Sequence, residues 1–543
     1  MKLMAAQINP TIGDLAGNVK KIIDALQRAK KLVVDIVLFP ELSVTGYPPE
    51  DLLLDPAFIA EAEAQLEVIC PFTKGLLALI GLPRSNPRKG EKFLCNSAAV
   101  FRNGELIGFK DKTLLPTYDV FDERRYFEPG DEALLVEYLG WRVAVTICED
   151  IWHSGALGYT NYEKNPVVSL KKERPDLLLN LSSSPYSFQR KEIRIDICKA
   201  AAKTLECPVV LCNQVGANDQ LVFDGYSLHV NEKGELLHMA KGFVEEDLLI
   251  ELDVHACPCS RIQNEMADLY GALVLGVRDY FHKQGFSKAL IGLSGGIDSA
   301  LVACIAKDAL GPGCVKALAL PSRFSSPASS FDAACLAKRL GIALQEVSID
   351  SLFQHYLEVL QSEMQGELID LVKENLQARI RAMLLMAHSN QEGALLLNTS
   401  NKSEVAMGYT TLYGDLCGGF AVISDLLKSR VYELCHFVNQ QEEIIPQSIL
   451  DKVPSAELRP HQTDLDSLPP YEILDPILED YLEKQMSLEV ISQTRNVPLP
   501  FVQDLIQKVH AAEYKRRQAP LGIRVTQKAF TKGRVVPVVQ RWR

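Results

Sequence analysis

"KALIGLSGGIDSALVACIAK", residues 288–307, joins an apolar run to a glycine–serine turn and then to a second apolar run with helical spacing. Gly295 and Gly296 allow a tight turn that exposes backbone N–H groups, and the following helix directs its positive end toward the same point. The stretch therefore predicts a strand, an anion-binding loop and a helix, which is the repeating unit of a doubly wound parallel sheet.

The loop in this stretch matches neither of two common phosphate-binding patterns. The Walker pattern requires Gly, four residues and then Gly-Lys-Ser/Thr, but Gly292 is followed by Leu-Ser-Gly-Gly-Ile. The dinucleotide fingerprint also fails, because no third glycine follows Gly296 at the required position. Two glycines with Ser294, Asp298 and Ser299 nevertheless favour a phosphate site over a turn with ordinary helix caps. An acid in an anion site indicates that Mg²⁺ lies between Asp298 and the phosphates.

Length and composition restrict the class of protein. The 543 residues are too many for one core, and 47% hydrophobic with 23% charged residues is ordinary globular composition. The net charge of -12 argues against a nucleic-acid partner, although small anionic ligands need only a local positive patch. We expect no secretory signal, no membrane span, and a cytoplasmic protein whose thirteen cysteines are reduced. Cys257 and Cys259 lack a second ligand pair, so no structural zinc is predicted.

The pattern of apolar runs divides the chain near residue 260, into domains 1–260 and 261–543. The first domain alternates β-rich runs with helical stretches, which predicts an α/β sandwich with mixed sheets. The second has a series of strand-like runs, "KALIGLS", "VKALALPS", "ALQEVSID" and "GALLLNTSN", with helices between them. This series predicts a doubly wound parallel sheet. The basic segment 516–543 has no strong periodicity and is predicted to fray unless it covers an anionic site.

The motif "LSGGIDS" resembles the SGGxDS pyrophosphate loop of the ATP pyrophosphatases, which cleave ATP between the α and β phosphates. The resemblance implies that the β and γ phosphates leave together as pyrophosphate. Because the loop has no lysine, we expect the cation to come from elsewhere in the chain, and Lys428 is the candidate. The ATP-binding residues that the resemblance implies in the loop are Gly292, Leu293, Ser294, Gly295, Gly296, Ile297, Asp298 and Ser299.

Downstream segments narrow the substrate. In order, "KENLQARIRAMLLM", "LLLNTSNKSEVAMGYTTLYGD", "SDLLKSRVYEL", "KVPSAELRP", "LPPYEILD" and "EYKRRQAP" resemble the NAD synthetase domain. Leu412 and Ser455 depart from it, since short, ammonia-only relatives carry Lys and Thr there. The resemblance implies that Thr399 and Lys428 contact ATP, that Asp298 and Glu404 hold Mg²⁺, and that Asn375, Arg379, Glu404 and Lys515 contact deamido-NAD.

The first domain carries a second candidate chemistry. Cys148 ends an apolar strand-like run, and Glu41 and Lys112 each follow another. A thiol needs a base to become a nucleophile, and an amide oxygen that develops charge needs a fixed cation. A Cys is by default a small buried hydrophobe, so only the joint pattern carries weight. Glu, Lys and Cys in these settings resemble the nitrilase superfamily, whose fold is an αββα sandwich.

The nitrilase resemblance implies one role for each residue. Cys148 is then the nucleophile, Glu41 the general base, Lys112 the oxyanion stabiliser and Glu123 an acid that positions the site. Nitrilase domains fused to NAD synthetases hydrolyse glutamine, so the implied substrate is glutamine. The implied glutamine-binding residues are Tyr118, Glu149, Ser184 and Arg190.

The two resemblances together imply glutamine-dependent NAD⁺ synthesis. ATP adenylates deamido-NAD, and ammonia from glutamine, channelled between the domains, gives NAD⁺ with release of AMP, pyrophosphate and glutamate. A dry channel keeps ammonia unprotonated and therefore nucleophilic. The implied partners are these small molecules and further copies of the chain, through the synthetase domain.

Other functions stay open at this point. Another glutamine amidotransferase with a pyrophosphatase loop is the nearest alternative, although Lys2 stands where asparagine synthetases need Cys. Cys148 also lacks the Gly-x-Cys-x-Gly elbow of GMP synthetases. A nitrilase with an inert partner domain and a nucleotide sensor without turnover are further alternatives. Pyrophosphate release on addition of ATP, Mg²⁺ and deamido-NAD separates the sensor from an enzyme.

Overall fold

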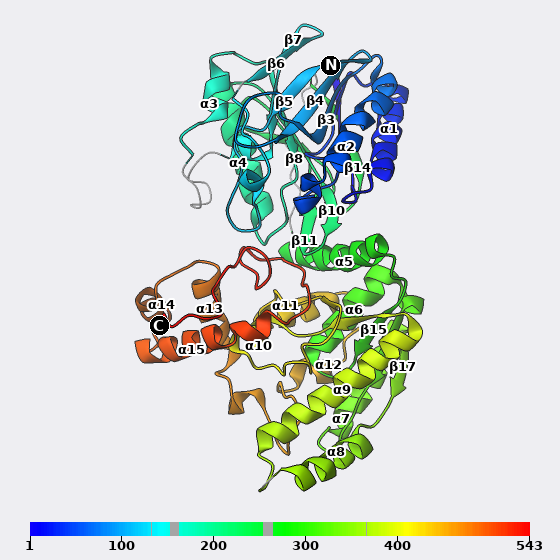
Figure 1. Ribbon diagram of the computed structural model, residues 1–543, viewed down its shortest axis with the longest axis vertical. Helices are drawn as coiled ribbons and strands as arrows, with labels where there is room; N and C mark the ends of the chain where they lie inside the picture. The colour runs from blue at the N-terminus through cyan, green and yellow to red at the C-terminus, as the bar shows by residue number, and fades with distance from the viewer. Residues whose placement is uncertain (132, 153–161, 253–263, 365, 543) are drawn as a thin grey trace. The chain divides into compact units, whose positions relative to one another are not determined.

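The computed structural model describes residues 1–131, 133–152, 162–252, 264–364 and 366–542. The chain forms two compact units, Met1–Glu265 and Met266–Arg543, which are described separately (Figure 1). The domain boundary expected near residue 260 lies outside the described residues, as do Cys257 and Cys259, so both expectations stay predictions.

The first unit contains two six-stranded sheets that mix parallel and antiparallel pairs. One sheet has the order β14 (Glu246–Glu251), β1 (Lys2–Gln7), β2 (Ile36–Leu38), β3 (Leu77–Ser85), β4 (Leu94–Arg102), β5 (Glu105–Asp111). The other has the order β13 (Leu236–Met239), β12 (Leu228–Val230), β9 (Val209–Asn213), β8 (Leu177–Ser182), β7 (Trp141–Ile147), β6 (Leu134–Tyr138). A two-stranded ribbon joins β10 (Val215–Asn218) to β11 (Leu221–Asp224).

Helices cover the outer face of each sheet in this unit. Helices α1 (Leu15–Lys31) and α2 (Pro56–Ile69) lie on the first sheet, and α3 (Pro166–Lys171) and α4 (Arg190–Leu205) lie on the second. Successive side chains of a strand alternate between faces. In β2, Val37 therefore packs with the helices while its two neighbours pack against the second sheet. The predicted αββα sandwich is confirmed.

The second unit is built on one parallel sheet. Its order is β17 (Ala343–Glu346), β16 (Val315–Ala319), β15 (Ala289–Gly292), β18 (Leu395–Asn398), β19 (Phe420–Ala421). Helices α6 (Ile297–Leu310), α7 (Pro327–Leu340) and α9 (Asp370–Glu392) connect and pack against the strands. The doubly wound sheet is confirmed. Its strand order reverses between β15 and β18, and in such sheets ligands bind at the carboxyl ends of the strands beside the reversal.

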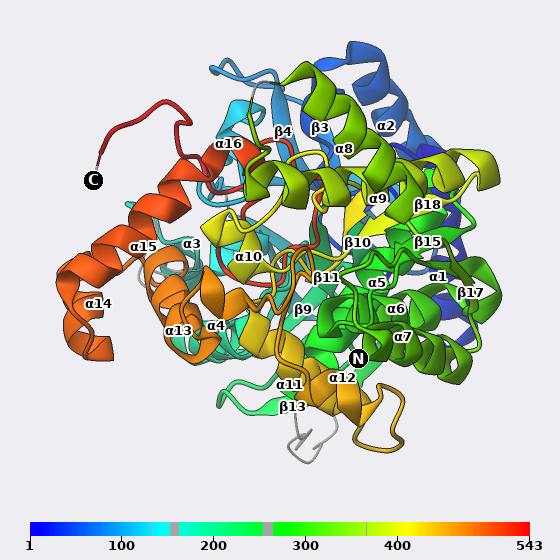
Figure 2. The ribbon, with the colours of Figure 1, turned by 90° about the horizontal axis from the view of Figure 1, so that it is seen from below.

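The remaining helices are accessory to the sheet. Figure 2 shows α13, α14 and α15 gathered on one side of the unit, away from α8, and these three helices share an apolar core of their own. The accessory helices are α5 (Glu265–Gln284), α8 (Asp350–Glu363), α10 (Lys402–Met407), α11 (Lys428–Val438), α12 (Gln447–Asp451), α13 (Tyr471–Leu482), α14 (Leu488–Arg495), α15 (Leu499–Ala511) and α16 (Glu513–Arg516). Short 3₁₀ turns span Glu50–Leu54, Cys70–Thr73, Glu123–Arg125, Cys148–Ile151, Pro312–Cys314 and Asp464–Asp466.

The C-terminal segment is ordered where it runs beside the sheet. The backbone N–H groups of Val525 and Thr526 donate to the Asp425 carboxylate at 2.8 and 2.7 Å. Gly522 pairs in parallel with Ala421 of β19. The predicted fraying is therefore wrong for residues 522–526, because a buried carboxylate and a strand edge satisfy this backbone.

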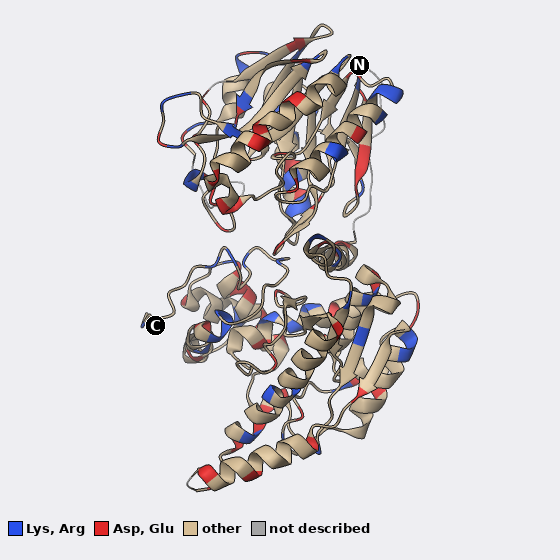
Figure 3. Ribbon diagram, turned by 45° about the vertical axis from the view of Figure 1, so that its right-hand side comes forward, with Lys and Arg blue, Asp and Glu red and all other residues tan. Residues whose placement is uncertain are grey.

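Charged residues of both signs are interspersed over the elements of each unit, as Figure 3 shows. Within the described part of the chain, no helix combines the length and the apolar character needed to cross a bilayer.

Candidate active sites

The candidate nucleophile lies at a strained position on a strand end. Cys148 follows β7 directly, is buried, and has a backbone φ of +42°, a region that residues other than glycine rarely adopt. The neighbouring parallel strand β8 supports it. Ser182 Oγ lies 3.4 Å from Cys148 Sγ, and Asn180 Nδ2 lies 3.5 Å from the Cys148 carbonyl oxygen. The strand ends thus hold the thiol in one orientation.

A buried lysine lies between two carboxylates beside this thiol. Lys112 Nζ is 2.7 Å from Glu41 Oε1 and 2.7 Å from Glu123 Oε1. Burial opposes the lysine charge, but Glu123 and Glu41 raise the pKa of Lys112 well above its usual value. Burial, with the charge of Glu41, raises the pKa of Glu123 to about 7 even though Lys112 acts against it. Lys112 is therefore a fixed cation, as oxyanion stabilisation requires.

The electrostatics of Cys148 link it to the same cluster. Burial raises the pKa of the Cys148 thiol, the charge of Glu41 raises it further, and Lys112 lowers it. The resting thiol is therefore protonated and needs a base. The structure brings Cys148, Glu41, Lys112 and Glu123 together, as the sequence predicts.

Three polar contacts that sequence reasoning missed orient the carboxylates. Tyr47 donates to Glu123 Oε1 at 2.8 Å, and Asn96 Nδ2 donates to Glu41 Oε1 at 2.7 Å. The Ser183 N–H donates to the second oxygen of Glu41 at 3.1 Å. The three donors come from different parts of the chain, so no local motif could have shown these contacts.

The Asp150 carboxylate connects the strand end that carries the thiol to the one that carries the lysine. Its Oδ2 accepts the Ile147 N–H at 3.0 Å, one residue before Cys148. Its Oδ1 accepts the Thr113 and Leu114 N–H groups at 2.9 Å each, directly after Lys112. Three N–H donors on one buried carboxylate make a rigid link, because charge-assisted hydrogen bonds are the stronger ones.

Three of the four predicted glutamine-binding residues interact with one another. Tyr118 donates to Glu149 Oε1 at 2.9 Å. Burial raises the pKa of the Glu149 carboxyl, while Lys112, Tyr118 and Arg190 act in the opposite direction. The fourth residue, Ser184, follows β8 and donates its N–H to Asn213 Oδ1 at 2.9 Å.

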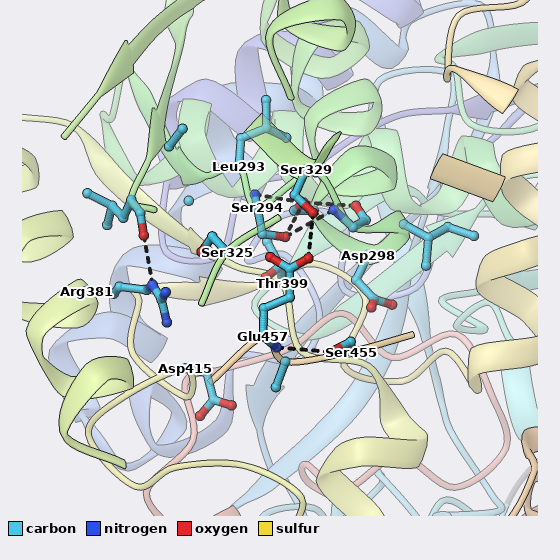
Figure 4. A pocket seen from close by; sticks show the side chains of 18 of the residues that line it. Leu293, Ser294, Asp298, Ser325, Ser329, Arg381, Thr399, Asp415, Ser455 and Glu457 are labelled. Carbon is cyan, nitrogen blue, oxygen red and sulfur yellow. Dashed lines mark hydrogen bonds between the residues drawn. The ribbon is translucent and has the colours of Figure 1, made fainter. Parts of the chain in front are cut away.

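In the second unit, the glycine–serine loop lines a cavity of about 560 Å³. Ser294 Oγ lies 3.1 Å from Ser299 Oγ and accepts the Gly296 N–H at 3.2 Å. Figure 4 shows Ser294, Asp298 and Thr399 around this space. The predicted residues that line it are Gly292, Leu293, Ser294, Gly295, Gly296, Ile297, Asp298, Ser299, Thr399, Glu404 and Lys428.

The two predicted metal ligands converge on one cation. Lys428 Nζ lies 2.5 Å from Asp298 Oδ2 and 3.1 Å from Glu404 Oε1. Asn401 fixes both acids, since its Nδ2 donates to Asp298 Oδ1 at 3.1 Å and its Oδ1 accepts the Glu404 N–H at 3.0 Å. Burial raises the pKa of Glu404 to about 7, with Lys428 lowering it and Asp298 raising it. The Asp298 and Glu404 carboxylates are therefore placed so that both could bind one cation.

The described residues hold no group of three or more His, Cys, Asp or Glu that could bind a metal. A divalent cation bound by Asp298 and Glu404 would therefore need further ligands beyond these two side chains, and Mg²⁺ beside nucleotides usually takes phosphate oxygens and water.

Three of the four residues predicted for the dinucleotide, Asn375, Arg379 and Lys515, contact the segment 408–412, whereas the fourth, Glu404, lies at Lys428. Thr411 Oγ1 donates to Asn375 Oδ1 at 2.7 Å, and Arg379 Nε donates to the Leu412 carbonyl at 3.2 Å. Lys515 Nζ donates to the carbonyls of Gly408 and Thr410 at 2.9 and 2.6 Å. Residues far apart in the sequence thus meet around one loop.

Comparison with known proteins assigns both units to families. Residues 2–257 match the family model described as carbon-nitrogen hydrolase, and residues 269–519 match NAD synthase. The glutamine-dependent NAD(+) synthetase of Synechocystis sp. is 44% identical to the chain, covering 98% of each. The chain belongs to the glutamine-dependent NAD(+) synthetase family.

Two further members of the glutamine-dependent NAD(+) synthetase family resemble the chain over its whole length. The Thermotoga maritima relative is 40% identical, covering 100% of this chain and 99% of its own. The solved structure from Acinetobacter baumannii, a complex with ADP, has a TM-score of 0.78 at 37% identity, covering 99% of this chain and 98% of that one.

The synthetase cavity also contains charged residues that sequence reasoning missed. Arg381 donates its Nε to the Leu320 carbonyl at 2.9 Å, and burial lowers its pKa to about 10. Figure 4 shows Arg381 and Asp415 in this cavity. Both residues lie in segments that resemble the NAD synthetase domain, but sequence reasoning singled out neither, because a single charged residue is usually solvated. The missed charged residues that line the cavity are Arg381, Asp415, Lys452, Glu457 and Asp464.

Proposed function

We propose that the chain is a glutamine-hydrolysing NAD⁺ synthase, a carbon–nitrogen ligase. The reaction combines deamido-NAD, ATP, glutamine and water, and gives NAD⁺, AMP, pyrophosphate and glutamate. Family membership over the whole chain supports the proposal. The observation that carries it is the presence in one chain of the cluster Glu41, Lys112 and Cys148 and of the cavity lined by the glycine–serine loop.

Glutamine hydrolysis takes place in the first unit. Glu41 accepts the thiol proton of Cys148, and the sulfur attacks the amide carbon of glutamine. Lys112 stabilises the oxyanion of the tetrahedral intermediate, and Glu41 returns the proton to the leaving nitrogen, which departs as ammonia. Water then hydrolyses the thioester to glutamate. Substrate is held by Tyr118, Glu149, Ser184 and Arg190.

NAD⁺ synthesis takes place in the second unit. The glycine–serine loop, Thr399 and Lys428 bind ATP, and a carboxylate oxygen of deamido-NAD attacks the α phosphorus. The bond between the α phosphorus and its bridging oxygen breaks, and pyrophosphate leaves with that oxygen. Ammonia attacks the acyl carbon of the adenylate, loses a proton, and displaces AMP. The dinucleotide is held by Asn375, Arg379, Glu404 and Lys515.

Asp298 and Glu404 are the residues that hold Mg²⁺ in this proposal. The converging carboxylates support it, because their mutual repulsion at Lys428 is relieved by added positive charge. Bound there, the ion would supply positive charge to neutralise the pyrophosphate. Asn401 holds the two carboxylates in position, and Lys428 adds a further positive charge beside them.

The ammonia passes from the first site to the second without equilibrating with water. Ammonium predominates at neutral pH and has no lone pair with which to attack.

The chain acts in the cytoplasm, because the eleven cysteines in the described regions are free thiols and a reducing compartment keeps them so.

The chain forms a homo-oligomer through the second unit. Helix α8 buries only one residue, Phe353, while α8 and α9 expose large apolar side chains. Leu352, Tyr356 and Val359 recur at helical spacing on one face of α8, and contiguous exposed apolar groups mark protein interfaces. The exposed residues are Leu352, Tyr356, Val359, Leu371, Met383 and Met386. Light scattering of the purified chain, beside a Leu352→Glu/Val359→Glu variant, tests this interface.

The proposed function is tested by NAD⁺ formation with glutamine or with ammonium chloride, each with and without deamido-NAD. We expect NAD⁺, AMP and pyrophosphate in equal amounts with either nitrogen source, and none without the dinucleotide. Glutamine hydrolysis without any deamido-NAD-dependent pyrophosphate would instead indicate an amidase with an inert second unit.

A further inference from the structure

The glycine–serine loop is contacted by a lysine that lies 157 residues away in the chain. Lys452 follows α12 and lines the same cavity as the loop. Its Nζ lies 3.0 Å from the Gly295 carbonyl oxygen, 3.2 Å from Ser329 Oγ and 2.7 Å from Asp332 Oδ2. A lysine from outside the loop therefore contacts it, through the backbone carbonyl of Gly295 and not through a phosphate.

Gly295 lies in close contact with helix α7. Its φ is +78°, and a Cβ there would lie 2.2 Å from the Ser329 carbonyl oxygen. The loop backbone therefore packs directly against the first turn of α7, and only glycine fits. The direction of its carbonyl is then decided by the groups around it.

The direction of this carbonyl matters for an anion site. The C=O and the following N–H of a trans peptide point in opposite directions. With the Gly295 carbonyl on Lys452, the Gly296 N–H points the other way and meets Ser294 Oγ at 3.2 Å. A carbonyl oxygen turned toward phosphates would repel them, whereas N–H groups bind them.

Lys452 is itself held in place. Asp332 is only 2% exposed and also accepts the Ser448 hydroxyl at 2.5 Å. Glu457 accepts the Ser329 hydroxyl at 2.8 Å and the Ser326 N–H at 3.2 Å, so the chain on both sides of Lys452 is fastened to α7. Figure 4 shows Glu457 and Ser329 joined.

We propose that Lys452 is a positioning residue, which holds the Gly295 carbonyl away from the phosphates so that the loop presents its N–H groups to the departing pyrophosphate. The inference rests on the proposed ATP-binding role of the loop. It predicts a selective effect on ATP and pyrophosphate, because three of the four residues proposed for deamido-NAD lie around segment 408–412, and none of the four contacts Lys452 in the described structure.

The test compares Lys452→Met, Lys452→Gln and Lys452→Arg in the full-length chain, using ammonium-driven synthesis. Lys508→Met is the matched control, since Lys508 is half exposed on α15 and pairs only with Asp504 among the ion pairs of the described residues. We expect Lys452→Met to raise the KM for ATP and the inhibition constant of inorganic pyrophosphate about tenfold, the equivalent of one lost charge-assisted hydrogen bond. The KM for deamido-NAD should change less than twofold.

Gln and Arg sharpen the outcome, since both keep an N–H donor. We expect them to lose less ATP affinity than Met, with melting temperatures near that of the parent. An ATP KM within twofold of the parent in all three variants would overturn the inference. Equal losses for ATP and deamido-NAD, together with a lowered melting temperature, would also overturn it by showing a general structural role. A parent chain that binds no ATP would instead refute the proposed function.

Discussion

The Lys428 ammonium lies 2.5 Å from the Asp298 carboxylate, although 130 residues separate them in the chain. Asp298 is the second residue of α6, just after the glycine–serine loop, and Lys428 begins α11. The same ammonium contacts Glu404, so two acids and one base share a single point of the cavity. The charge balance of the ATP site therefore depends on each of the three.

Asp298→Asn should abolish both glutamine-driven and ammonium-driven synthesis. The amide cannot neutralise Lys428 or bind a divalent cation as a carboxylate does, so a loss of at least about 100-fold in kcat/KM is expected. Pyrophosphate release measures it. Asp308→Asn is the control, because Asp308 lies on the same helix but accepts a hydrogen bond from the Tyr270 hydroxyl. This variant should keep most activity. Normal ATP turnover in Asp298→Asn would remove the metal role from this residue.

Cys148→Ala should abolish glutamine-driven synthesis and leave ammonium-driven synthesis largely unchanged. The nucleophile is lost, but ammonia from solution still reaches the adenylate in the second unit. NAD⁺ formation with each nitrogen source measures the split. Cys198→Ala removes another buried thiol of the same unit, on α4, and should retain both activities. Equal loss of both activities in Cys148→Ala would contradict two separate sites.

Asp150→Asn should slow glutamine-driven synthesis about 10- to 100-fold while sparing the ammonium reaction. An amide nitrogen replaces one acceptor oxygen, so the link between the Ile147 N–H and the segment after Lys112 is weakened by about 1–3 kcal/mol. The rate of Cys148 alkylation by iodoacetamide across pH is the second readout, and its profile should shift.

Asp176→Asn is the matched control for Asp150, because Asp176 accepts the Arg142 N–H at the opposite end of β7. That variant should keep the alkylation profile of the parent. If both variants behaved alike, the effect of Asp150 would lie in the stability of β7 rather than in the site.

The first unit should lose stability as the pH falls below about 6.5. His229 is buried on β12 with its Nδ1 3.1 Å from that of His238, and burial together with His238 lowers its pKa to about 4. In the unfolded chain His229 is protonated at its ordinary pKa of 6.5, whereas in the folded chain it stays neutral down to about pH 4. Protonation therefore favours the unfolded chain between these two pH values. The loss across this window is up to about 3 kcal/mol.

Melting temperatures of the parent and of His229→Phe, measured from pH 7 to pH 5, test this. The variant should show a flatter decline, and His355→Gln, an exposed histidine of α8, should follow the parent. A decline of the same steepness in His229→Phe would place the sensitivity elsewhere.

Much of the fold was predictable, because β-rich runs and helical periodicity are local properties. The predictable site residues are those in a contiguous motif, such as Ser294 and Asp298, or directly after a strand, such as Cys148. Asp150 and Lys452 were not predictable, because each acts through backbone groups 37 and 157 residues away. The C-terminal segment was misjudged for the same reason, since its order depends on Asp425, about 100 residues earlier.

The pairing of Gly522 with Ala421 has a further consequence, for solubility and protein engineering. The two-residue strand β19 would otherwise leave unpaired N–H and C=O groups at that side of the sheet, and open edges recruit strands from other chains. The Ala421 N–H donates to the Leu521 carbonyl, and its own carbonyl accepts the Ile523 N–H. Truncation before residue 521 would expose this edge and promote aggregation, whereas a tag fused after the last residue would leave it covered.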